Sequence, residues 1–477
     1  MNWSTIIIIL MFIINITFIG ALIFIERKDP STTWAWLLVI NIFPIGGFFI
    51  YLLFGQNFTR EKKFKRKLIS DEKKKKYFNV KREQYKIDES IAENIDLVEM
   101  NYRNSNSMYT QLNDVDIYFD GNDKFKALLE SIKGAKKYIH IEYYIFRRDR
   151  IGDEIINLLI EKLKEGVEVR LLVDAMGSSK INHRKKIQDY IDAGGKYAVF
   201  FPGLTAHINM RINYRDHRKI VVVDGKEGFL GGFNVGDEYL GRDKKIGYWR
   251  DTHFKIKGEA IRELEERFLL DWTYAADEDV TDLDKYLKVE ENLESNVGMQ
   301  IVSSGPDHEE QYIKNAYVKI INNAKKYVYL QSPYFVPDET LLQALRISAL
   351  SGVDVRIMIP GNPDHVFMGW AASSYVSELL YVGVKVYYYN KGFLHAKTIV
   401  SDDTVCSIGT ANMDIRSFKL NFETNAFIYN KNIAIDMKKR FNIDIEESHL
   451  ISEEEYKNRS VWRKIAESIV RLLSPIL

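Results

Sequence analysis

Residues 217–234 read HRKIVVVDGKEGFLGGFN, and residues 395–412 read HAKTIVSDDTVCSIGTAN. Both follow the spacing H-x-K-x4-D-x6-G-x2-N. One copy of this pattern would arise by accident in about one of several thousand chains of this length. Two copies in one chain therefore indicate a duplicated unit.

The sequence upstream of each motif repeats as well. YIHIEYYIF at position 138 is matched by YVYLQSPYF at position 327, and VEVRLLVD at 167 is matched by VDVRIMIP at 353. The second pair lies slightly closer together than the first, as expected of two diverged copies. The period is too long for a solenoid, so we predict two similar domains in a pseudo-twofold arrangement, with a shared site possible at their interface.

Each copy alternates helical and strand-like segments. Residues 122–132 and 153–166 have the apolar spacing of helices, whereas 137–146 and 167–174 are rich in strand-forming residues. Runs such as IVVV and VRLLV do not alternate in polarity, which indicates sheets buried on both faces. The expected fold class is α/β, with mixed sheets flanked by helices. We expect the first domain at 110–290 and the second at 291–477.

The spacing of the motif predicts a reactive cleft. Histidine and lysine two positions apart on a strand point to the same face, and a glycine turn returns the asparagine beside them. Imidazole can attack phosphorus or donate a proton to a leaving oxygen, while lysine and asparagine can hold phosphodiester oxygens. The sequence therefore predicts phosphodiester chemistry with no cofactor and no metal, because the lysines supply the positive charge. The residues concerned are His217, Lys219, Asn234, His395, Lys397 and Asn412.

The N-terminal part of the chain, positions 1–59, contains two uncharged segments separated by Glu26-Arg27-Lys28-Asp29-Pro30. Each exceeds the roughly 20 apolar residues that span a bilayer as a helix, so we expect transmembrane helices at about 4–25 and 33–55. A cleaved signal peptide is the alternative for the first. The segment lacks a basic n-region and an A-x-A-like site, and a second span comes directly after it.

Residues 60–86 hold 13 Lys/Arg against 4 Asp/Glu. Since the whole chain carries +1 and residues 1–59 balance, residues 87–477 carry a net −8. A basic run directly after a membrane helix indicates that the remainder of the chain is cytoplasmic, and it attracts anionic lipid. We therefore expect a basic juxtamembrane linker over 60–109. The alternative is a solvated linker without lipid specificity. No aromatic-interleaved module accompanies the lysines, so nucleic acid is not expected as a partner.

The duplicated pattern resembles the HKD motif of the phospholipase D superfamily, over about residues 110–450. With the two N-terminal segments, and with stretches such as GTANMDIRSFKLNFE and RLLSPIL, the chain is similar to bacterial cardiolipin synthases. The resemblance implies condensation of two phosphatidylglycerols into cardiolipin and glycerol, through a phosphatidyl-histidine, at a bacterial cell membrane. It implies that His217 is the nucleophile and His395 the acid. The HKD residues it carries over are His217, Lys219, Asp224, His395, Lys397 and Asp402, the two aspartates being mainly structural.

A nucleophilic histidine needs its other ring nitrogen held, usually by a carboxylate. The superfamily places this carboxylate on a later strand. Asp251 comes after His217 in the strand-like run WRDTHFKI, and Glu423 comes after His395 in LNFETNAFI. We expect Asp251 to orient His217 and Glu423 to orient His395, and the coupled imidazoles to give a bell-shaped pH profile. The alternative is that both are ordinary surface carboxylates.

Two other activities would need the same residue types. A hydrolytic phospholipase D or a nuclease would use the same histidines, whereas intact motifs in both halves disfavour a non-catalytic scaffold. His140 and His207 lie outside the motifs, so we expect them to be packed or exposed rather than catalytic. Residues 461–477 have helical apolar spacing, which fits either a membrane surface or the catalytic domains. Phosphatidylglycerol and anionic lipids are the expected partners, and the oligomeric state is open.

The charge pattern predicts a topology that cysteine labelling can test. A cysteine placed between Glu26 and Pro30 should react with an impermeant thiol reagent in intact cells, and one near position 290 should not. The single native cysteine, Cys406, stays as the background control. The reverse labelling pattern would contradict the topology.

Overall fold

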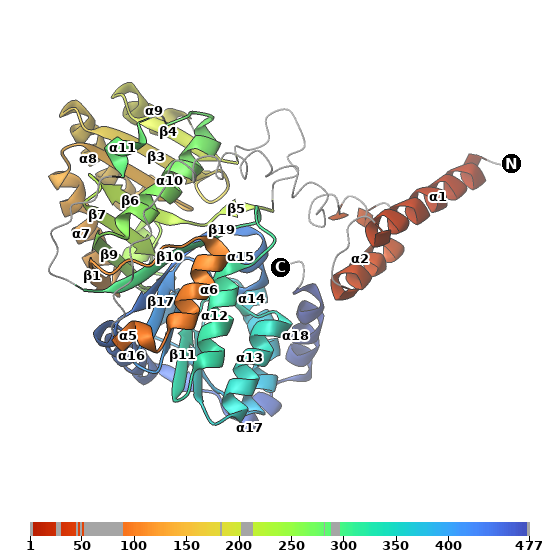
Figure 1. Ribbon diagram of the computed structural model, residues 1–477. Coiled ribbons are helices and arrows are strands. Elements are labelled where there is room, and N and C mark those ends of the chain that lie inside the picture. Colours follow the sequence, from red (N-terminus) through yellow and green to blue (C-terminus); the bar gives the residue numbers. More distant parts are fainter. Residues whose placement is uncertain are drawn as a thin grey trace.

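The computed structural model describes residues 3–24, 30–43, 46–47, 50–51, 89–181, 184–201, 213–280, 282–287 and 296–474. Figure 1 shows two α/β halves packed against each other, with two N-terminal helices projecting to one side. The basic run 60–86, His183 and His207 lie outside the described residues.

The first half is built on a seven-stranded sheet with the order β1-β9-β7-β6-β2-β3-β4. The strands β2, β3 and β4 are parallel, and the remaining pairs are antiparallel. The strands are β1 (Asn113–Tyr118), β2 (Tyr138–Tyr143), β3 (Glu168–Asp174), β4 (Lys196–Phe200), β6 (Lys219–Val223), β7 (Glu227–Gly231) and β9 (His253–Gly258).

The second half repeats this order as β10-β19-β17-β16-β11-β13-β14, and β20 is added at the edge. Each pair has the same direction as its counterpart, with β11, β13 and β14 parallel. The predicted duplication is confirmed. The strands are β10 (Gly298–Ser304), β11 (Tyr327–Gln331), β13 (Asp354–Pro360), β14 (Lys385–Tyr389), β16 (Thr398–Ser401), β17 (Val405–Gly409), β19 (Asn421–Tyr429) and β20 (Ser448–Leu450).

The helices that cover the sheets also correspond between the halves. In the first half α8 comes after β2, and in the second α13 comes after β11. Asp149 and Asp338 cap these two helices, because their side chains accept from the backbone N–H of Gly152 and Leu341. The helices are α7 (Gly121–Gly134), α8 (Arg150–Lys164), α9 (Arg184–Asp192), α10 (Ile261–Ala276) and α11 (Leu283–Tyr286), then α12 (Tyr312–Asn323), α13 (Glu339–Leu350), α14 (Val366–Leu380), α15 (Ile415–Lys419) and α16 (Lys431–Glu446).

The hydrophobic core joins the halves. One cluster of buried side chains contains Val221 of β6 and lies in the first half except for Phe393, and a second is centred on β11 and β13. A third cluster contains Ile220 and Leu230 of the first sheet together with Ile408 and Ile428 of the second. The apolar runs IVVV and VRLLV are buried throughout, as predicted. The halves therefore pack as one body through shared apolar contacts.

Short strands also cross from one half to the other. β5 (Arg215–Asp216) pairs in parallel with the start of β19, and β15 (Gly392–Leu394) pairs in parallel with β8 (Tyr248–Arg250). β5 leads into the first motif and β15 into the second. The backbone entering each motif is thus hydrogen-bonded to the opposite half.

The motif aspartates hold the far ends of the motif strands. Asp224 and Asp402 lie in the turns after β6 and β16, both with left-handed backbones at φ 55° and 52°. The carboxylate of Asp224 accepts from the backbone N–H of Lys136, Lys137 and Tyr138, at 2.7, 2.7 and 2.9 Å. Asp402 repeats these contacts at the start of β11. Each carboxylate therefore ties the motif turn to the first strand of its own half, and these hydrogen bonds offset the strained backbone.

Residues 89–105 fall within the expected linker yet form α5 (Glu89–Ala92) and α6 (Ile95–Ser105). Leu97 and Val98 of α6 enter the core of the second half. The Nδ2 of Asn101 donates to the Oε1 of Gln300 at 3.2 Å. Segment 89–105 thus belongs to the folded body, as Figure 1 shows for α6 beside α12.

The C-terminal segment docks by the side of its last helix that carries Val470, which is buried in the core of the second half, and Arg471. α17 (Glu453–Lys457) and α18 (Val461–Leu473) come after β20. The Nη1 of Arg471 donates to the carbonyl of Ser374 on α14 at 3.2 Å, and buried Glu467 pairs with Arg459 at 3.1 Å. The opposite side of α18 exposes five apolar residues, which are Val461, Trp462, Ile465, Ile469 and Leu472.

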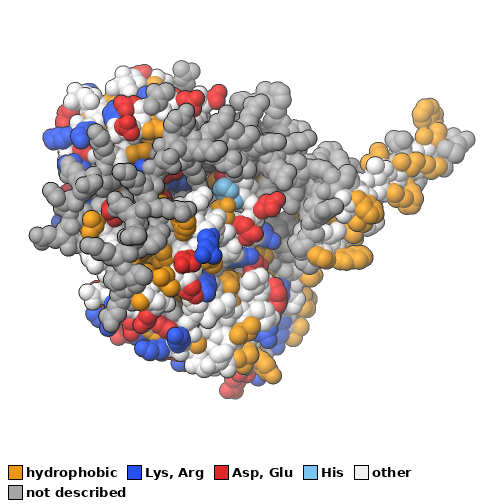
Figure 2. Space-filling model, in the orientation of Figure 1, with side chains coloured by type: hydrophobic (Ala, Val, Ile, Leu, Met, Phe, Trp, Pro, Cys, Tyr) orange, Lys and Arg blue, Asp and Glu red, His pale blue; other side chains and the backbone are white. Residues whose placement is uncertain are grey.

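The N-terminal helices are α1 (Trp3–Phe24) and α2 (Pro30–Ile42), which pack together through Leu22, Trp36 and Ile40. Hydrophobic side chains cover much of their surface (Figure 2). Within the part of the chain that the structure describes, no helix has both the length and the apolarity needed to cross a membrane. The expected span over 33–55 appears as α2 over its first part, and residues 44–45, 48–49 and 52–55 lie outside the described residues.

Asp224→Asn and Asp402→Asn should destabilise the fold more than they impair the chemistry. Each substitution weakens three charge-assisted hydrogen bonds, so we expect the free energy of unfolding to fall by about 2–4 kcal/mol. Denaturant unfolding and turnover of the folded protein measure the two effects. Asp403→Asn is the matched control at a neighbouring carboxylate, which pairs with Lys438. Full stability with complete loss of turnover would instead place the motif aspartates in the chemistry.

Candidate functional site

The two motifs converge on one cavity of about 450 Å³ between the halves. His217 and Asn234 line it from the first half, and His395 and Asn412 from the second. The imidazoles are only 8% and 7% exposed. The structure therefore brings together side chains that lie far apart in the sequence.

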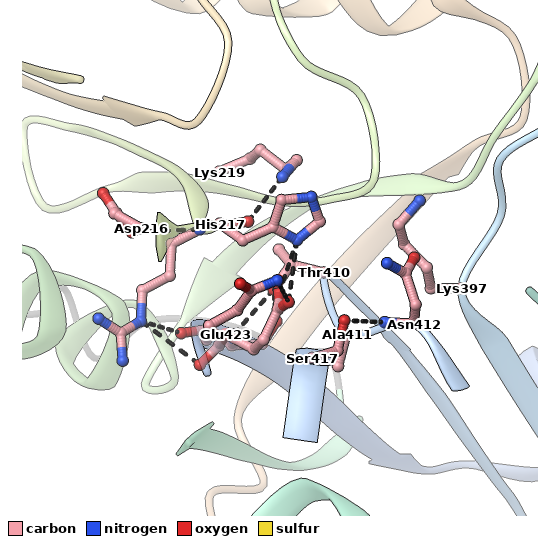
Figure 3. Close-up of polar contacts among 12 residues, drawn as sticks. Asp216, His217, Lys219, Lys397, Thr410, Ala411, Asn412, Ser417 and Glu423 are labelled. Carbon is pink, nitrogen blue, oxygen red and sulfur yellow. Dashed lines mark hydrogen bonds and ion pairs between the residues drawn. The ribbon is translucent and has the colours of Figure 1, made fainter. Parts of the chain in front are cut away.

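The two motif lysines are buried next to the imidazoles. Lys219 Nζ donates to the carbonyl of His217 at 2.6 Å, and Lys397 Nζ donates in the same way to the carbonyl of His395. In Figure 3, Lys219 and Glu423 lie on either side of His217, and Lys397 and Asn412 lie across from it. The imidazoles thus line the cavity, whereas the two lysines are fully buried next to them and are not among the residues that line it.

Each imidazole is bound by a carboxylate from the opposite half. His217 Nδ1 lies 3.0 and 2.9 Å from the two carboxylate oxygens of Glu423, and His395 Nδ1 lies 2.6 Å from Asp251 Oδ2. Asp251 and Glu423 are both fully buried. The expected pairing of Asp251 with His217 and of Glu423 with His395 is therefore wrong, and so is the alternative of surface carboxylates.

The strands that cross between the halves explain this exchange. The His217 N–H donates to the carbonyl of Phe422 at 2.9 Å, next to Glu423, and the His395 N–H donates to the carbonyl of Arg250 at 2.7 Å, next to Asp251. Because β5 and β15 each extend into the other half, the acid nearest to each histidine comes from that half.

Burial dominates the electrostatics of the four basic groups. It lowers the pKa of His395 to about 4, with Lys397 adding to the effect, and brings the pKa of His217 well below its usual range. Burial likewise lowers the pKa of Lys219 to about 7 and that of Lys397 to about 8. Without an anion in the cavity, the imidazoles are neutral at neutral pH and the lysines are close to losing their protons.

The two carboxylates that hold the imidazoles differ in the direction of their pKa shift. Burial raises the pKa of Glu423 to about 7, although Lys219 and the hydroxyl of Thr410 act in the opposite direction. Burial would also raise the pKa of Asp251, but Lys397 and His395 together bring it below its usual range. Asp251 is therefore ionised at neutral pH, whereas Glu423 is only partly so.

Both motif asparagines reach the cavity; the side chain of Asn234 is partly engaged, whereas Asn412 Oδ1 has no hydrogen-bond partner among the described residues. Asn234 Oδ1 accepts from the backbone N–H of Ile145 at 3.1 Å, and its Nδ2 donates to the hydroxyl of Tyr239 at 3.1 Å. The backbone N–H of Asn412 donates to Ser417 Oγ at 3.2 Å. Each Nδ2 carries two hydrogens, so an anion in the cavity can still receive a hydrogen bond from either amide.

Other predicted residues lie elsewhere. Asp224 and Asp402 are at the far ends of the motif strands and do not line the cavity. His140 is buried between Glu265, 2.6 Å away, and Arg170, 3.0 Å away, which confirms the expectation of a packed histidine. Among the described residues, no group of three or more His, Cys, Asp or Glu side chains could hold a metal ion.

Sequence reasoning missed several residues of the cavity. Tyr144 packs against His217 with ring centroids 4.9 Å apart, and Trp249 packs against His395 at 5.0 Å. Arg215 and Arg416 also line the cavity. Trp249 lies two positions before Asp251, and Arg215 lies two positions before His217. The i, i+2 spacing on a strand, which predicted that the lysines face the cleft, could therefore have predicted these two residues as well.

Comparisons with known proteins agree with this geometry. A family model described as a cardiolipin synthase, phospholipase D-like domain matches residues 128–272 and 317–445, more than half of the chain. The cardiolipin synthase of Clostridium perfringens is 56% identical over 457 residues, covering 95% of this chain and 96% of that protein. The chain belongs to the cardiolipin synthase family.

Other relatives extend the match within this family and beyond it. The major cardiolipin synthase of Bacillus subtilis is 47% identical over the full length of both chains. A model described as a phospholipase D-nuclease N-terminal region matches residues 6–56. The solved phosphatidylserine synthase of Haemophilus influenzae has a TM-score of 0.61 at 17% identity, and the match covers 82% of this chain and 100% of that one, which shows a common fold.

The lowered lysine pKa values predict the alkaline limb of the pH profile. Lys219 and Lys397 lose their charge as pH rises through about 7 and 8, so kcat/KM for a phospholipid should fall above that range. On the acid side kcat/KM should not fall between pH 7 and about 5, because His217 stays neutral there while the protonated fraction of the expected acid, His395, increases. The alkaline limb of the kcat profile should lie at higher pH than that of kcat/KM, because bound phosphate stabilises the protonated form of the two lysines. A kcat/KM that still rises at about pH 9 would contradict the assignment.

Proposed function

We propose that this protein is a membrane phosphatidyltransferase that condenses two phosphatidylglycerols into cardiolipin and glycerol. One observation carries the proposal. In a chain of this family, two imidazoles face a single cavity, each held by a carboxylate, with two lysines beside them. This arrangement supplies a nucleophile, an acid and positive charge to one phosphodiester.

The proposed reaction is a double displacement. His217 Nε2 attacks the phosphorus of the first phosphatidylglycerol, and the P–O bond to glycerol breaks as His395 protonates the departing oxygen. His395 then takes the proton from a hydroxyl of the second phosphatidylglycerol. That oxygen attacks phosphorus and releases His217. Lys219 and Lys397, with Asn234 and Asn412, stabilise the charge on the five-coordinate phosphorus.

The difference between the carboxylates supports this assignment of roles. Ionised Asp251 stabilises a positive charge on His395, which suits the group that must carry a proton. Glu423, whose pKa is raised to about 7, gives His217 less help in taking up a proton. His217 therefore keeps the free lone pair that nucleophilic attack requires, while its Nδ1 is held in place.

We further propose that residues 1–59 form a two-helix transmembrane hairpin, about 4–25 and 33–55, with both catalytic domains in the cytoplasm. The uncharged sequence, the match at 6–56 and the basic run 60–86 support this location. The apolar outer side of α18 supports a membrane-facing catalytic body, because Trp462, Ile469 and Leu472 are 80%, 55% and 74% exposed. The expected domain boundaries, 110–290 and 291–477, belong to the same proposal.

Purified protein given phosphatidylglycerol alone distinguishes the possible activities. Cardiolipin and glycerol in equal amounts support the synthase, whereas phosphatidic acid would identify a hydrolytic phospholipase D. The reaction should proceed in excess chelator, because Lys219 and Lys397 provide the charge. His217→Ala and His395→Ala should each lower turnover by about 10⁴-fold or more.

Acid-quenched protein tests the histidine roles. With phosphatidylglycerol labelled at phosphorus, wild type and His395→Ala should carry covalent label, the variant slowly, and His217→Ala should carry none. Label on His217→Ala but never on His395→Ala would reverse the roles. Label on neither histidine in wild type would exclude the double displacement. His140→Ala is a control at a histidine outside the cavity.

A further inference from the structure

Two arginines lie in the cavity on the side of His217. Arg215 belongs to β5 and Arg416 to α15, and both line the cavity wall. Arg416 donates from Nη1 and Nη2 to the side-chain and backbone oxygens of Asn213, both at 2.9 Å. This contact fixes one face of its guanidinium, and no carboxylate among the described residues pairs with its charge.

Arg215 is more deeply buried, at 5% exposure. Its Nη1 lies 4.0 Å from Asp174 Oδ2, and its Nη2 is buried without a hydrogen-bond partner among the described residues. Asp174 also accepts from the backbone N–H groups of Met176, Gly177 and Asp216. Because Asp174 is shared among these groups, one N–H donor of the Arg215 guanidinium has no acceptor. A buried donor without an acceptor is unfavourable unless a ligand accepts its hydrogen bond.

The two guanidiniums repel each other. Burial lowers the pKa of Arg215, and the charge of Arg416 lowers it further. Two other acids of the cavity have partners of their own: Asp414 caps α15 through the N–H of Ser417, and Asp364 accepts from the hydroxyl of Tyr334. An anion placed beside the guanidiniums would relieve the repulsion.

The cationic pair breaks the pseudo-twofold symmetry. When the two motifs are superposed in sequence, with His217 on His395, Arg215 corresponds to Phe393 and Arg416 to Glu238. Glu238 is buried and pairs with Arg147 at 2.8 Å. The side of His395 therefore has an aromatic ring and a neutralised acid where the side of His217 has two positive charges.

We propose that Arg215 and Arg416 form a second anion subsite, which binds the intact phosphate of the second phospholipid. The proposal rests on the proposed function, in which two phosphodiesters share one cavity. The reacting phosphate is bound by the two lysines and the two asparagines. The other phosphate is only a three-carbon glycerol bridge away, so it needs its own cations close by. Water carries no such group, and the subsite would thus favour a phospholipid acceptor over hydrolysis.

Two water-soluble acceptors isolate this subsite. Glycerol and glycerol 3-phosphate offer the same kind of hydroxyl, but only the second carries a phosphate. With phosphatidylglycerol as donor, glycerol 3-phosphate takes the phosphatidyl group through its hydroxyl, which yields phosphatidylglycerol phosphate and releases glycerol. Glycerol as acceptor regenerates phosphatidylglycerol, so isotope-labelled glycerol is used and its incorporation into lipid is measured. We expect wild type to prefer glycerol 3-phosphate in kcat/KM by about tenfold or more, and Arg416→Gln to lose that preference.

The ratio of the two acceptors is measured within one protein, so a partly misfolded variant does not distort it. Arg215→Gln should act in the same direction, and cardiolipin yield should fall relative to phosphatidic acid in both variants. Arg147→Gln is the matched control, because this arginine lines the same cavity but pairs with Glu238. It should leave the ratio unchanged.

Four results would be decisive, three against the subsite and one against the proposed function. Equal use of the two acceptors by wild type would overturn the subsite, and so would an unchanged preference in both arginine variants. A loss of the preference in Arg147→Gln as well would show a general effect of positive charge, which also overturns it. Failure of wild type to transfer the phosphatidyl group to any acceptor would instead contradict the proposed function.

Discussion

The site depends on the exchange of two short strands between the halves. β5 runs beside β19 and β15 beside β8, so the backbone N–H of each motif histidine is hydrogen-bonded to the opposite half. The carboxylates that hold the imidazoles then arrive from across the interface. Arg250 strengthens the same link through its buried ion pair with Asp444. A single half would contain a histidine and a lysine but no partner for the imidazole.

Burial makes this arrangement responsive to an anion. Two histidines line one cavity with two buried lysines next to them, and desolvation lowers the pKa of each of the four groups. A phosphodiester that enters brings negative charge next to these groups, and this stabilises the protonated lysines. Binding of the anion therefore offsets the unfavourable free energy of burying the four basic groups. The dielectric constant of the buried site is low, so the stabilisation of charge is strong there.

The duplicated halves have diverged where two different tasks are needed. Strand order and direction are the same in both, and so are the carboxylates that tie each motif turn to β2 or β11. The differences lie around the imidazoles: Asp251 against Glu423, Trp249 against Tyr144, and the arginine pair on one side only. A symmetric scaffold thus holds an asymmetric site, which fits the proposed reaction with one nucleophile and one acid.

Local patterns alone determined the duplication, the motif strands and the residues that share a face with each histidine. Fixed spacing and alternation are properties of a single strand, so His217 with Lys219, and His395 with Lys397, followed from the i, i+2 rule. Only the tertiary structure decided which carboxylate holds which histidine. Asp251 comes after His217 along the chain but binds His395, because that choice is made by strand pairing across the interface, between segments distant in sequence. The arginine pair has the same origin: Arg215 and Arg416 belong to different halves and meet only when the halves pack.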